Sequence, residues 1–546
     1  MQNRIAVAPF LRLRLAFDSV VTVGRGSAAA SGLPGFRTWM IALVAAIGYY
    51  LGSRIGFFFT PASSPISTFW PPNAILLAIF LLTARRMWWV LVLAVLPAHF
   101  LIQVGTGVPV LSALGWFIGN VGEALLGAAC IRFFQKESDR LFTSVRGVVT
   151  FWVFGVLLAP LLTSFLDAGS TDLTGLGRGY WTLWMHRLTS NMVATLTVVP
   201  AIVTFVTGGI QRFRKANRAQ YFEAVLLTAS SAVVTFLVFA KGHLFGNGPA
   251  LLFAPLSLLV WATLRFGPTG LSFAALEVTL ISVWSALQGR GIFEYSSPTD
   301  RVVPVHILLG LFLLPLMLIA VVVAEQREAV KNTRDELIDA REQESHRIAR
   351  ELHADIAGRL TLAGIGLDEL RGACADSPLD RIYAQVSDAL NAVLHLCHKI
   401  YPFYTEYLGL TRSLIKLCRD TSAENGITIN PLVGDLPFDL PLNVSLRIFR
   451  VAQLALQHVV ERKASTAAVR LTVSGGQVFL RIADDGTGID LHSRETVGLA
   501  YVREQTLSLG GTFKAISGPD KGMVVETSIP VAKVSPSSGV SRQIGN

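Results

Sequence analysis

The sequence predicts a multi-domain chain with three folded parts. These are a polytopic α-helical membrane bundle, a helical hairpin that dimerises into a four-helix bundle, and an α/β sandwich. Residues 39–324 are mostly apolar, whereas the part that follows has an ordinary soluble composition. Helical spacing of apolar residues follows the last apolar run, and strands with glycine turns come later. At 546 residues the chain is also too long for a single core.

The N-terminal segment, residues 1–38, is expected to be cytoplasmic. It carries arginines but no compact apolar core ahead of a small-residue cleavage site, so no cleaved signal peptide is predicted. The net charge of +10 comes largely from short loops between apolar runs, which indicates membrane topology and not direct nucleic-acid binding. The four cysteines have no CxxC spacing, which favours reduced thiols.

The membrane sensor domain is predicted over residues 39–324, where ten apolar runs are long enough, or nearly so, to cross a bilayer. The runs cover residues 39–58, 70–84, 87–104, 109–134, 146–166, 184–207, 221–241, 249–265, 267–287 and 304–324. Alternate loops are rich in Arg and Lys, as at Arg85 and Arg86. The positive-inside rule then favours about ten spans with both termini in the cytoplasm. Eight spans plus re-entrant pieces is the alternative, because several runs are short.

Four charged residues are predicted at membrane depth, where each should face the bundle interior. They are Arg54, Glu123, Arg187 and Glu277. One span begins with Trp70, two prolines and Asn73, whose amide could bond to an interior group. The candidate ligand-binding residues are therefore Trp70, Asn73, Glu123 and Arg187. A buried ion pair or helix-end snorkelling explains such charges equally well.

The segments FWPPNAILLAIFLLTARR and LLFAPLSLLVWATLRFGPTG resemble the membrane-associated sensor domain called MASE, which precedes bacterial signalling modules. The resemblance covers about residues 40–325. It implies a multi-pass sensor in the bacterial cytoplasmic (inner) membrane, in contact with membrane lipid and with a small-molecule ligand whose identity the sequence does not give.

A signalling helix is predicted over residues 325–342, and a dimerisation domain over residues 343–406. Four apolar residues recur every four positions along the first helix, which suits a helix that pairs with another chain. They are Ile348, Leu352, Ile356 and Leu360. A second helix over about 377–397 completes a hairpin, and two hairpins make the four-helix bundle of a homodimer.

The string RIARELH, followed by the second helix and KIYPFYTEYLGL, resembles the phosphoacceptor domain of sensor kinases of the nitrate-sensor and hexose-phosphate-sensor class. By that likeness His353 accepts the phosphoryl group, and Glu351 is a second candidate catalytic residue. The family has Asp directly after the histidine and Gln four residues later, whereas this chain has Ala354 and Gly358. Asp355 is no substitute, because two residues along a helix is about 200° around its axis.

The ATP-binding domain is predicted over residues 411–532, before a disordered tail at 533–546. It contains the motifs Asp484-Asp485-Gly486-Thr487-Gly488-Ile489, Gly498-Leu499, Leu509-Gly510-Gly511 and Gly518-x-x-x-Gly522. Together these motifs resemble those of the GHKL-type ATPase fold. That likeness implies that Asp484 accepts from the adenine amine and that glycines let backbone amides approach the phosphates. The candidate nucleotide-binding residues are Asp484, Gly486, Gly488, Gly498, Leu499, Gly510, Gly511 and Gly522.

The metal position departs from that family. The helix before the strands normally carries Glu and, four residues on, an Asn that binds Mg²⁺, followed by Lys-His. Here Leu454 and His458 take the first two positions, and Glu461 and Arg462 take the place of Lys-His. A neutral imidazole is a poor ligand for a cation that prefers oxygen. The cofactors implied are ATP and Mg²⁺, with a degenerate metal site at His458.

Two functions are compatible with these motifs. The first is a two-component sensor histidine kinase that autophosphorylates His353 from ATP and passes the phosphoryl group to a response regulator. The alternative is a pseudokinase receptor that signals by conformation with weak or no kinase activity. A transporter is disfavoured because the soluble part has no P-loop. The sequence gives neither the regulator nor the direction of the signal.

The ten-span topology predicts the side of the membrane on which each loop lies. Reporters fused after residues 85, 140, 215 and 265 should report the cytoplasm, and those fused after 64, 175, 245 and 295 the far side, because the arginine-rich loops stay inside. An external reporter at residue 215 would contradict this topology.

Overall fold

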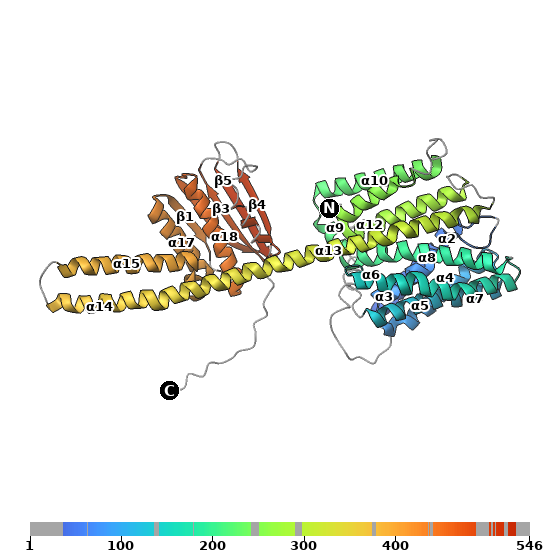
Figure 1. The fold of residues 1–546 in the computed structure, drawn as a ribbon, viewed down its shortest axis with the longest axis horizontal. Helices are drawn as coiled ribbons and strands as arrows, with labels where there is room; N and C mark the ends of the chain where they lie inside the picture. The colour runs from blue at the N-terminus through green and yellow to red at the C-terminus, as the bar shows by residue number, and fades with distance from the viewer. Residues whose placement is uncertain are drawn as a thin grey trace, which may run out of the picture. The chain divides into compact units, whose positions relative to one another are not determined.

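The computed structural model describes residues 36–62, 64–135, 141–177, 179–241, 251–289, 297–373, 378–434, 436, 440–486, 499, 502–503, 506–507, 509–517 and 522–530. The chain divides into two compact units, residues up to Val330 and residues from Lys331 onward. The first unit is a bundle of helices, and the second contains a helical hairpin and a five-stranded sheet (Figure 1). The predicted fold class is confirmed.

Eight helical segments within the described residues are long and apolar enough to cross a membrane, and the shorter apolar helix α3 (Pro71–Leu82) packs among them. The eight are α2 (Phe36–Phe58), α4 (Trp88–Gly105) after the turn η2 (Arg85–Met87), α5 (Val110–Phe134), α6–η4–α7 (Val145–Thr150, Phe151–Leu158 and Ala159–Leu173), α8–η5–α9 (Tyr180–Thr204, Phe205–Gly209 and Ile210–Lys215), α10 (Arg218–Lys241), α12 (Ala254–Leu287) and α13 (Pro298–Glu351).

The predicted apolar runs fall wholly or largely within these helices. The runs 249–265 and 267–287 both lie in α12, which is interrupted at Gly267. Gly267 has φ 66° and ψ −154°, a conformation that essentially only glycine adopts, and Pro268 follows it. The chain therefore breaks its helix at the predicted boundary. The number of membrane crossings stays a prediction.

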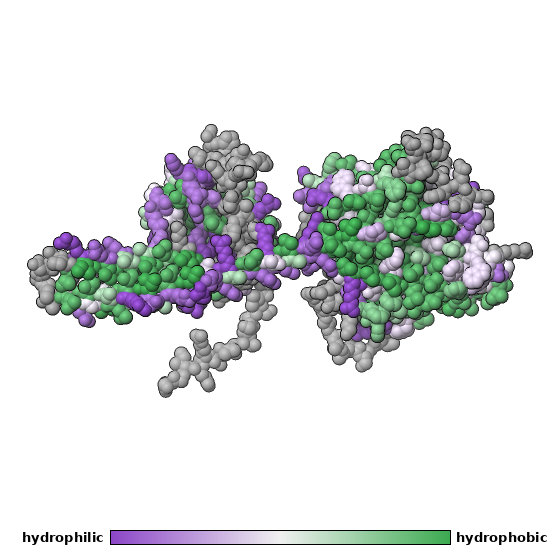
Figure 2. Space-filling view, viewed as in Figure 1, coloured by the Kyte–Doolittle hydropathy of each residue, from purple (hydrophilic) through white to green (hydrophobic). Residues whose placement is uncertain are grey.

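The outer surface of the bundle is rich in exposed apolar side chains, as a helix facing lipid requires. Figure 2 shows this surface as largely hydrophobic. Arg54 was expected to face the interior, but it is exposed. It lies in the last turn but one of α2, from which a long side chain reaches the polar interface by snorkelling. Glu277 is half-buried on α12.

The helix α13 extends well past the apolar run and contains the boundary between the two units. A π-helical stretch, η7 (Leu352–Ala357), follows it directly and includes His353. Then come α14 (Gly358–Ala373) and α15 (Pro378–Ile400), which pack side by side as a hairpin (Figure 1). Short π-helical insertions in α-helices are frequent at functional positions.

The hairpin carries exposed apolar residues along α14 and α15, visible as a hydrophobic stripe in Figure 2. Leu362, Ile365, Ile382 and Leu396 are between 46% and 71% exposed. A soluble helix exposes such a stripe when another protein surface covers it, as in a helical bundle formed by two chains.

The sheet has the order β1-β2-β3-β5-β4, with β1 and β2 parallel and the other pairs antiparallel. Its strands are β1 (Thr428–Val433), β2 (Thr466–Ser474), β3 (Gln477–Asp484), β4 (Thr512–Ser517) and β5 (Met523–Pro530). The helices α17 (Gly409–Asn425) and α18 (Leu442–Glu461) pack against it and bury its apolar face (Figure 1). Gly475 and Gly476 both have positive φ, so they form the two-residue turn predicted between β2 and β3.

Candidate functional site

Glu123 is the centre of a buried polar cluster in the helical bundle. Its Oε2 accepts hydrogen bonds from Asn73 Nδ2 at 3.0 Å, Asn191 Nδ2 at 2.7 Å and Thr163 Oγ1 at 3.3 Å. The side chains of Asn73, Asn191 and Glu123 are at most 2% exposed. One carboxylate therefore joins helices α3, α5, α7 and α8 at a single point.

A buried ion pair lies beside this carboxylate. Arg187 Nε is 3.5 Å from Asp167 Oδ2, with both side chains almost wholly buried. The guanidinium carbon of Arg187 lies 4.8 Å from the ring centre of Trp116 and 5.8 Å from that of Trp70. Indole faces attract cations, and the attraction strengthens away from water. The guanidinium group is therefore held by the two indole rings as well as by its long ion pair with Asp167.

The cluster has two layers, one helical turn apart. Each of three helices contributes two residues to the cluster, one to each layer. The two residues are four positions apart, so they lie on the same face of their helix. These pairs are Gly119 and Glu123 on α5, Thr163 and Asp167 on α7, and Arg187 and Asn191 on α8. A Cβ atom on Gly119 would lie 2.0 Å from Asp167 Oδ1, so only glycine leaves room for that carboxylate.

The structure brings together all four predicted ligand-binding residues, Trp70, Asn73, Glu123 and Arg187, and adds others that the sequence reasoning missed. Asp167 directly follows the predicted apolar run 146–166, so that run does not include it. Helix α7 continues to Leu173, and Asp167 is fully buried. A helix tolerates an acid at this depth when a cation lies nearby. For Asn191, the sequence did offer a signal: it lies four residues after Arg187 and therefore on the same face of its helix.

Several polar atoms of the cluster have no hydrogen-bond partner among the described residues. They are Asn73 Oδ1, Asn191 Oδ1, Asp167 Oδ1 and Oδ2, Arg187 Nε and Trp70 Nε1. Each buried polar atom left unpaired costs about 1–3 kcal/mol. Such a concentration in one place is typical of a binding site more than of a structural core.

A separate polar chain joins α2, α4 and α5. Asn120 Nδ2 donates to Tyr49 Oη at 3.0 Å, and Tyr49 Oη lies 2.9 Å from His99 Nδ1. His99 Nε2 lies 2.9 Å from the carbonyl of Ala113, which only accepts, so Nε2 carries the hydrogen and Nδ1 accepts from Tyr49. Tyr49 and His99 thus have defined donor and acceptor roles, whereas Asn120 Oδ1 has no partner among the described residues.

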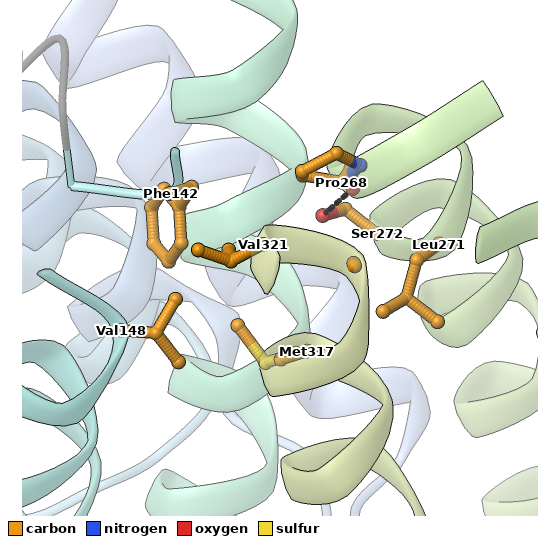
Figure 3. Close-up of a pocket in the computed structure, with 8 residues that line it drawn as sticks. Phe142, Val148, Pro268, Leu271, Ser272, Met317 and Val321 are labelled. Carbon is orange, nitrogen blue, oxygen red and sulfur yellow. Dashed lines mark hydrogen bonds between the residues drawn. The ribbon is translucent and has the colours of Figure 1, made fainter. Parts of the chain in front are cut away.

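A small pocket lies near Phe142, between α12 and α13 (Figure 3). Its lining is apolar apart from Ser272, whose Oγ donates to the carbonyl of Pro268 at 2.7 Å. The pocket therefore offers no charged group for recognition. The other lining residues are Val148, Leu271, Met317, Ala320 and Val321.

His353 is exposed in the π-helical stretch, between two ion pairs on its own helix. Glu351 accepts from Arg347 Nη1 at 2.6 Å, and Asp355 accepts from Arg359 Nε at 2.7 Å. Both neighbouring carboxylates are therefore engaged with arginines. Glu351, the second candidate catalytic residue, is thus bonded to an arginine that lies one turn before it on the same helix.

The base of the hairpin packs against the sheet domain through a small cluster made by Ala349, Tyr401 and Leu446. Arg450 of α18 donates to the carbonyl of Ile400 at 2.5 Å. Ala349 lies one turn before His353 along the same helical path. Within the second unit, the contacts at Ala349 and Ile400 join the hairpin directly to helix α18 of the sheet domain.

Asp484 ends β3 with its carboxylate buried. Its Oδ1 accepts from the amide of Gly486 at 2.9 Å, and its Oδ2 accepts from Arg462, which is itself only 7% exposed. A Cβ atom on Gly522 would lie 1.8 Å from the carbonyl oxygen of Asp484, so the two segments approach at backbone distance. The expected acceptor for an adenine amine thus already has a cationic partner.

The other predicted nucleotide-binding residues are placed as follows. Gly510 has φ 70°, and a Cβ atom on Gly511 would lie 2.3 Å from the carbonyl oxygen of Ser528, so both positions require glycine. Leu499 is buried in the core of the sheet domain. Gly488 and Gly498 lie outside the described residues. Next to Asp484, hydrogen bonds from the amide and hydroxyl of Thr466 lower the pKa of Asp485.

The metal position holds no arrangement suited to Mg²⁺. His458 Nδ1 lies 2.9 Å from Glu461 Oε2 on the same helix, and Leu454 packs partly buried against the core. In the part of the chain that the structure describes, no group of three or more His, Cys, Asp or Glu side chains could hold a metal ion. These residues do not fit the oxygen ligands that Mg²⁺ prefers.

Comparison with known families agrees with this organisation. Residues 41–327 match the MASE1 family, and residues 443–533 match the family of histidine kinase-, DNA gyrase B- and HSP90-like ATPases. A membrane sensor domain, a helical hairpin and this ATPase domain together form the architecture of a membrane sensor histidine kinase. The MASE1 match covers more than half of the chain, and the chain belongs to that family.

The curated relatives match about a third of this chain. The chain is 26% identical over 205 residues to the sensor protein VraS of Staphylococcus epidermidis, covering 36% of this chain and 58% of that protein. It is also 26% identical over 199 residues to VraS of Staphylococcus aureus strain COL, covering 35% and 57%. The chain therefore spans somewhat more than half the length of these relatives.

Solved histidine kinases match about a third of this chain at low similarity. The histidine kinase domain of the blue-light activated kinase EL346 from Erythrobacter litoralis is 18% identical, with a TM-score of 0.23, covering 35% of this chain and 94% of that chain. The histidine kinase AdeS of Acinetobacter baumannii is 14% identical, with a TM-score of 0.19, covering 32% and 95%.

The ion pair between Arg462 and Asp484 generates a prediction on nucleotide affinity. In the full chain, Arg462→His should tighten binding of a fluorescent ADP analogue by about tenfold, or roughly 1.4 kcal/mol, because Asp484 Oδ2 is released to accept from adenine. Arg481→His is the matched control, because Arg481 is exposed on β3, the strand that ends at Asp484, and pairs with Glu526. Unchanged affinity in a variant that keeps its thermal unfolding transition would contradict this competition.

Proposed function

We propose that the protein is a two-component sensor histidine kinase. Its membrane domain binds a ligand and controls ATP-dependent autophosphorylation of His353, followed by phosphotransfer to an aspartate of a response regulator. The observation that carries this proposal is the exposed His353, which follows the last apolar helix along one helical path and precedes an ATPase-type domain in the same chain.

The reaction at His353 is a phosphoryl transfer. An imidazole nitrogen forms a bond to the γ-phosphorus of ATP, the bond from that phosphorus to the bridging oxygen breaks, and ADP leaves. Exposure of His353 allows access to the nucleotide. Glu351 and Asp355 are both paired with arginines, and Ala354 stands where the family has its Asp. A missing general base typically costs about 10²–10⁴ in rate.

The sensing step is proposed to involve the buried cluster around Glu123. Trp70, Asn73, Glu123 and Arg187 come from three helices, α3 with its N-cap, α5 and α8, so a ligand there would bias the packing of several helices at once. We expect lipid to cover the outer apolar surface and both termini to be cytoplasmic, in a bacterial inner membrane.

The protein is proposed to act as a homodimer. The exposed apolar stripe of α14 and α15 supports this state, because two such hairpins bury their stripes in a four-helix bundle. The cognate response regulator would then approach His353 on the exposed face of that bundle.

A pseudokinase receptor is the second candidate function. Two observations favour it: His458 pairs with Glu461 in place of a metal ligand, and Arg462 engages the carboxylate of Asp484. Both arrangements disfavour metal-dependent use of ATP. In this alternative the nucleotide-type domain transmits conformation and does not transfer a phosphoryl group.

The identity of the phosphoacceptor is tested by labelling the full chain with radioactive ATP in the presence of Mn²⁺ or Mg²⁺. The label should be acid-labile, as phosphohistidine is, and should disappear in His353→Gln while the dimer is retained. His395→Gln is the matched control, because His395 is exposed on α15 and pairs with Glu424. Label that persists in His353→Gln would place the acceptor elsewhere, with His346 and His398 as the next candidates.

Restoring the family residues separates a weak kinase from a pseudokinase. Leu454→Glu with His458→Asn should raise binding of Mg-ATP and autophosphorylation, because a carboxylate and an amide oxygen suit the cation. Adding Ala354→Asp should raise the rate further, by up to about 10²–10⁴, as a recovered general base would. The measurement is the initial rate of label incorporation. A wild-type rate already equal to that of the triple variant would show that the altered residues are not defects.

A further inference from the structure

We propose that the buried cluster around Glu123 and Asp167 binds a small organic cation that carries N–H donors, of the primary ammonium class. This inference rests on the proposed sensing role of the membrane domain and names the chemistry of its ligand. It follows from which atoms in the cluster are left unpaired, and from the balance of charge around them.

The unpaired atoms on the asparagines are acceptors. Asn73 Nδ2 and Asn191 Nδ2 both donate to Glu123 Oε2, and an ionised carboxylate oxygen only accepts. With Glu123 ionised, these two bonds fix the orientation of both side-chain amides. Their Oδ1 atoms have no partner within the described residues, although the side chains are at most 1% exposed. A ligand that satisfies them must bring hydrogen-bond donors.

Asp167 adds two further acceptors. Its side chain is fully buried, and neither carboxylate oxygen has a hydrogen-bond partner in the described part of the chain. The charged group nearest to it is Arg187 Nε, at 3.5 Å, which is beyond good hydrogen-bond geometry. The space that Gly119 leaves beside Oδ1 keeps this carboxylate against α5.

The charge balance favours a cation. Two carboxyl groups, Glu123 and Asp167, face one guanidinium group, and the rings of Trp116 and Trp70 share that group's charge. An ammonium group would supply both the positive charge and up to three donors to the amide and carboxylate oxygens. An anion would find Arg187 Nε and Trp70 Nε1 but would be repelled by two carboxylates at low dielectric.

The experiment titrates the full chain in phosphatidylcholine nanodiscs at constant ionic strength and follows the thermal unfolding midpoint together with tryptophan fluorescence. The probes are propylammonium, tetramethylammonium (a cation with no N–H donor) and propionate. Propylammonium should raise the midpoint saturably, because a ligand that binds only the folded state stabilises it. At least tenfold more tetramethylammonium should be needed for the same shift, and propionate should have no effect.

Variants test the assignment to this cluster. Asn191→Leu removes one unpaired acceptor and should weaken the response to propylammonium at least tenfold. Ser272→Ala, in the apolar pocket between α12 and α13, is the control and should leave the response intact. If Asn191→Leu does not fold, the wild-type comparison of propylammonium with tetramethylammonium decides alone. An equal response to both cations, no response to either, or a response only to propionate would overturn the proposal.

These outcomes are distinguishable from failure of the kinase proposal. Binding in nanodiscs does not depend on His353, and labelling of His353 does not depend on which ligand binds. Loss of ammonium binding with labelling intact would overturn only the ligand class. Absence of labelling with ammonium binding intact would overturn the kinase activity and leave this site assigned.

Discussion

The carboxylate of Glu123 is the constraint on which the membrane unit depends. In a hydrocarbon surrounding, a buried charge must find its partners inside the protein. Glu123 finds them on three other helices, through Asn73, Thr163 and Asn191. The helices α3, α5, α7 and α8 therefore have one common register, and a shift of any of them by one turn would unpair the carboxylate.

A second constraint of the same kind organises the sheet domain. Asp484 lies at the end of β3, where its carboxylate accepts from the amide of Gly486 and from Arg462. Gly522 approaches its carbonyl at a distance that no other residue permits. This arrangement keeps the backbone geometry of an adenine-binding fold, while the charge of Arg462 occupies the group that would recognise adenine. The close approach of the two backbone segments depends only on glycine, whereas binding of an adenine amine depends on an acceptor that is free. The fold at this position can therefore persist without nucleotide recognition.

Local patterns predicted the elements well where the physical signal is local. The turn at Gly475 and Gly476 joins two strands of alternating residues, and the break in α12 at Gly267 falls at the boundary between the predicted runs 249–265 and 267–287. The predicted run 146–166 stops just before Asp167, whereas helix α7 continues through it to Leu173. Whether an acid belongs inside a membrane helix depends on a partner, here Arg187, that is distant along the chain.

The sequence by itself determined the order of domains, the apolar helices, the position of His353 and the departures at Leu454 and His458. These features depend on hydropathy, spacing and residue type, which are properties of short segments. Only the tertiary structure decided that Trp70, Asn73, Glu123 and Arg187 meet, and that Arg462 pairs with Asp484. Such pairings join side chains from separate elements. They are decided by helix packing and strand register, because a buried polar atom is satisfied only by groups that the whole fold brings within hydrogen-bond distance.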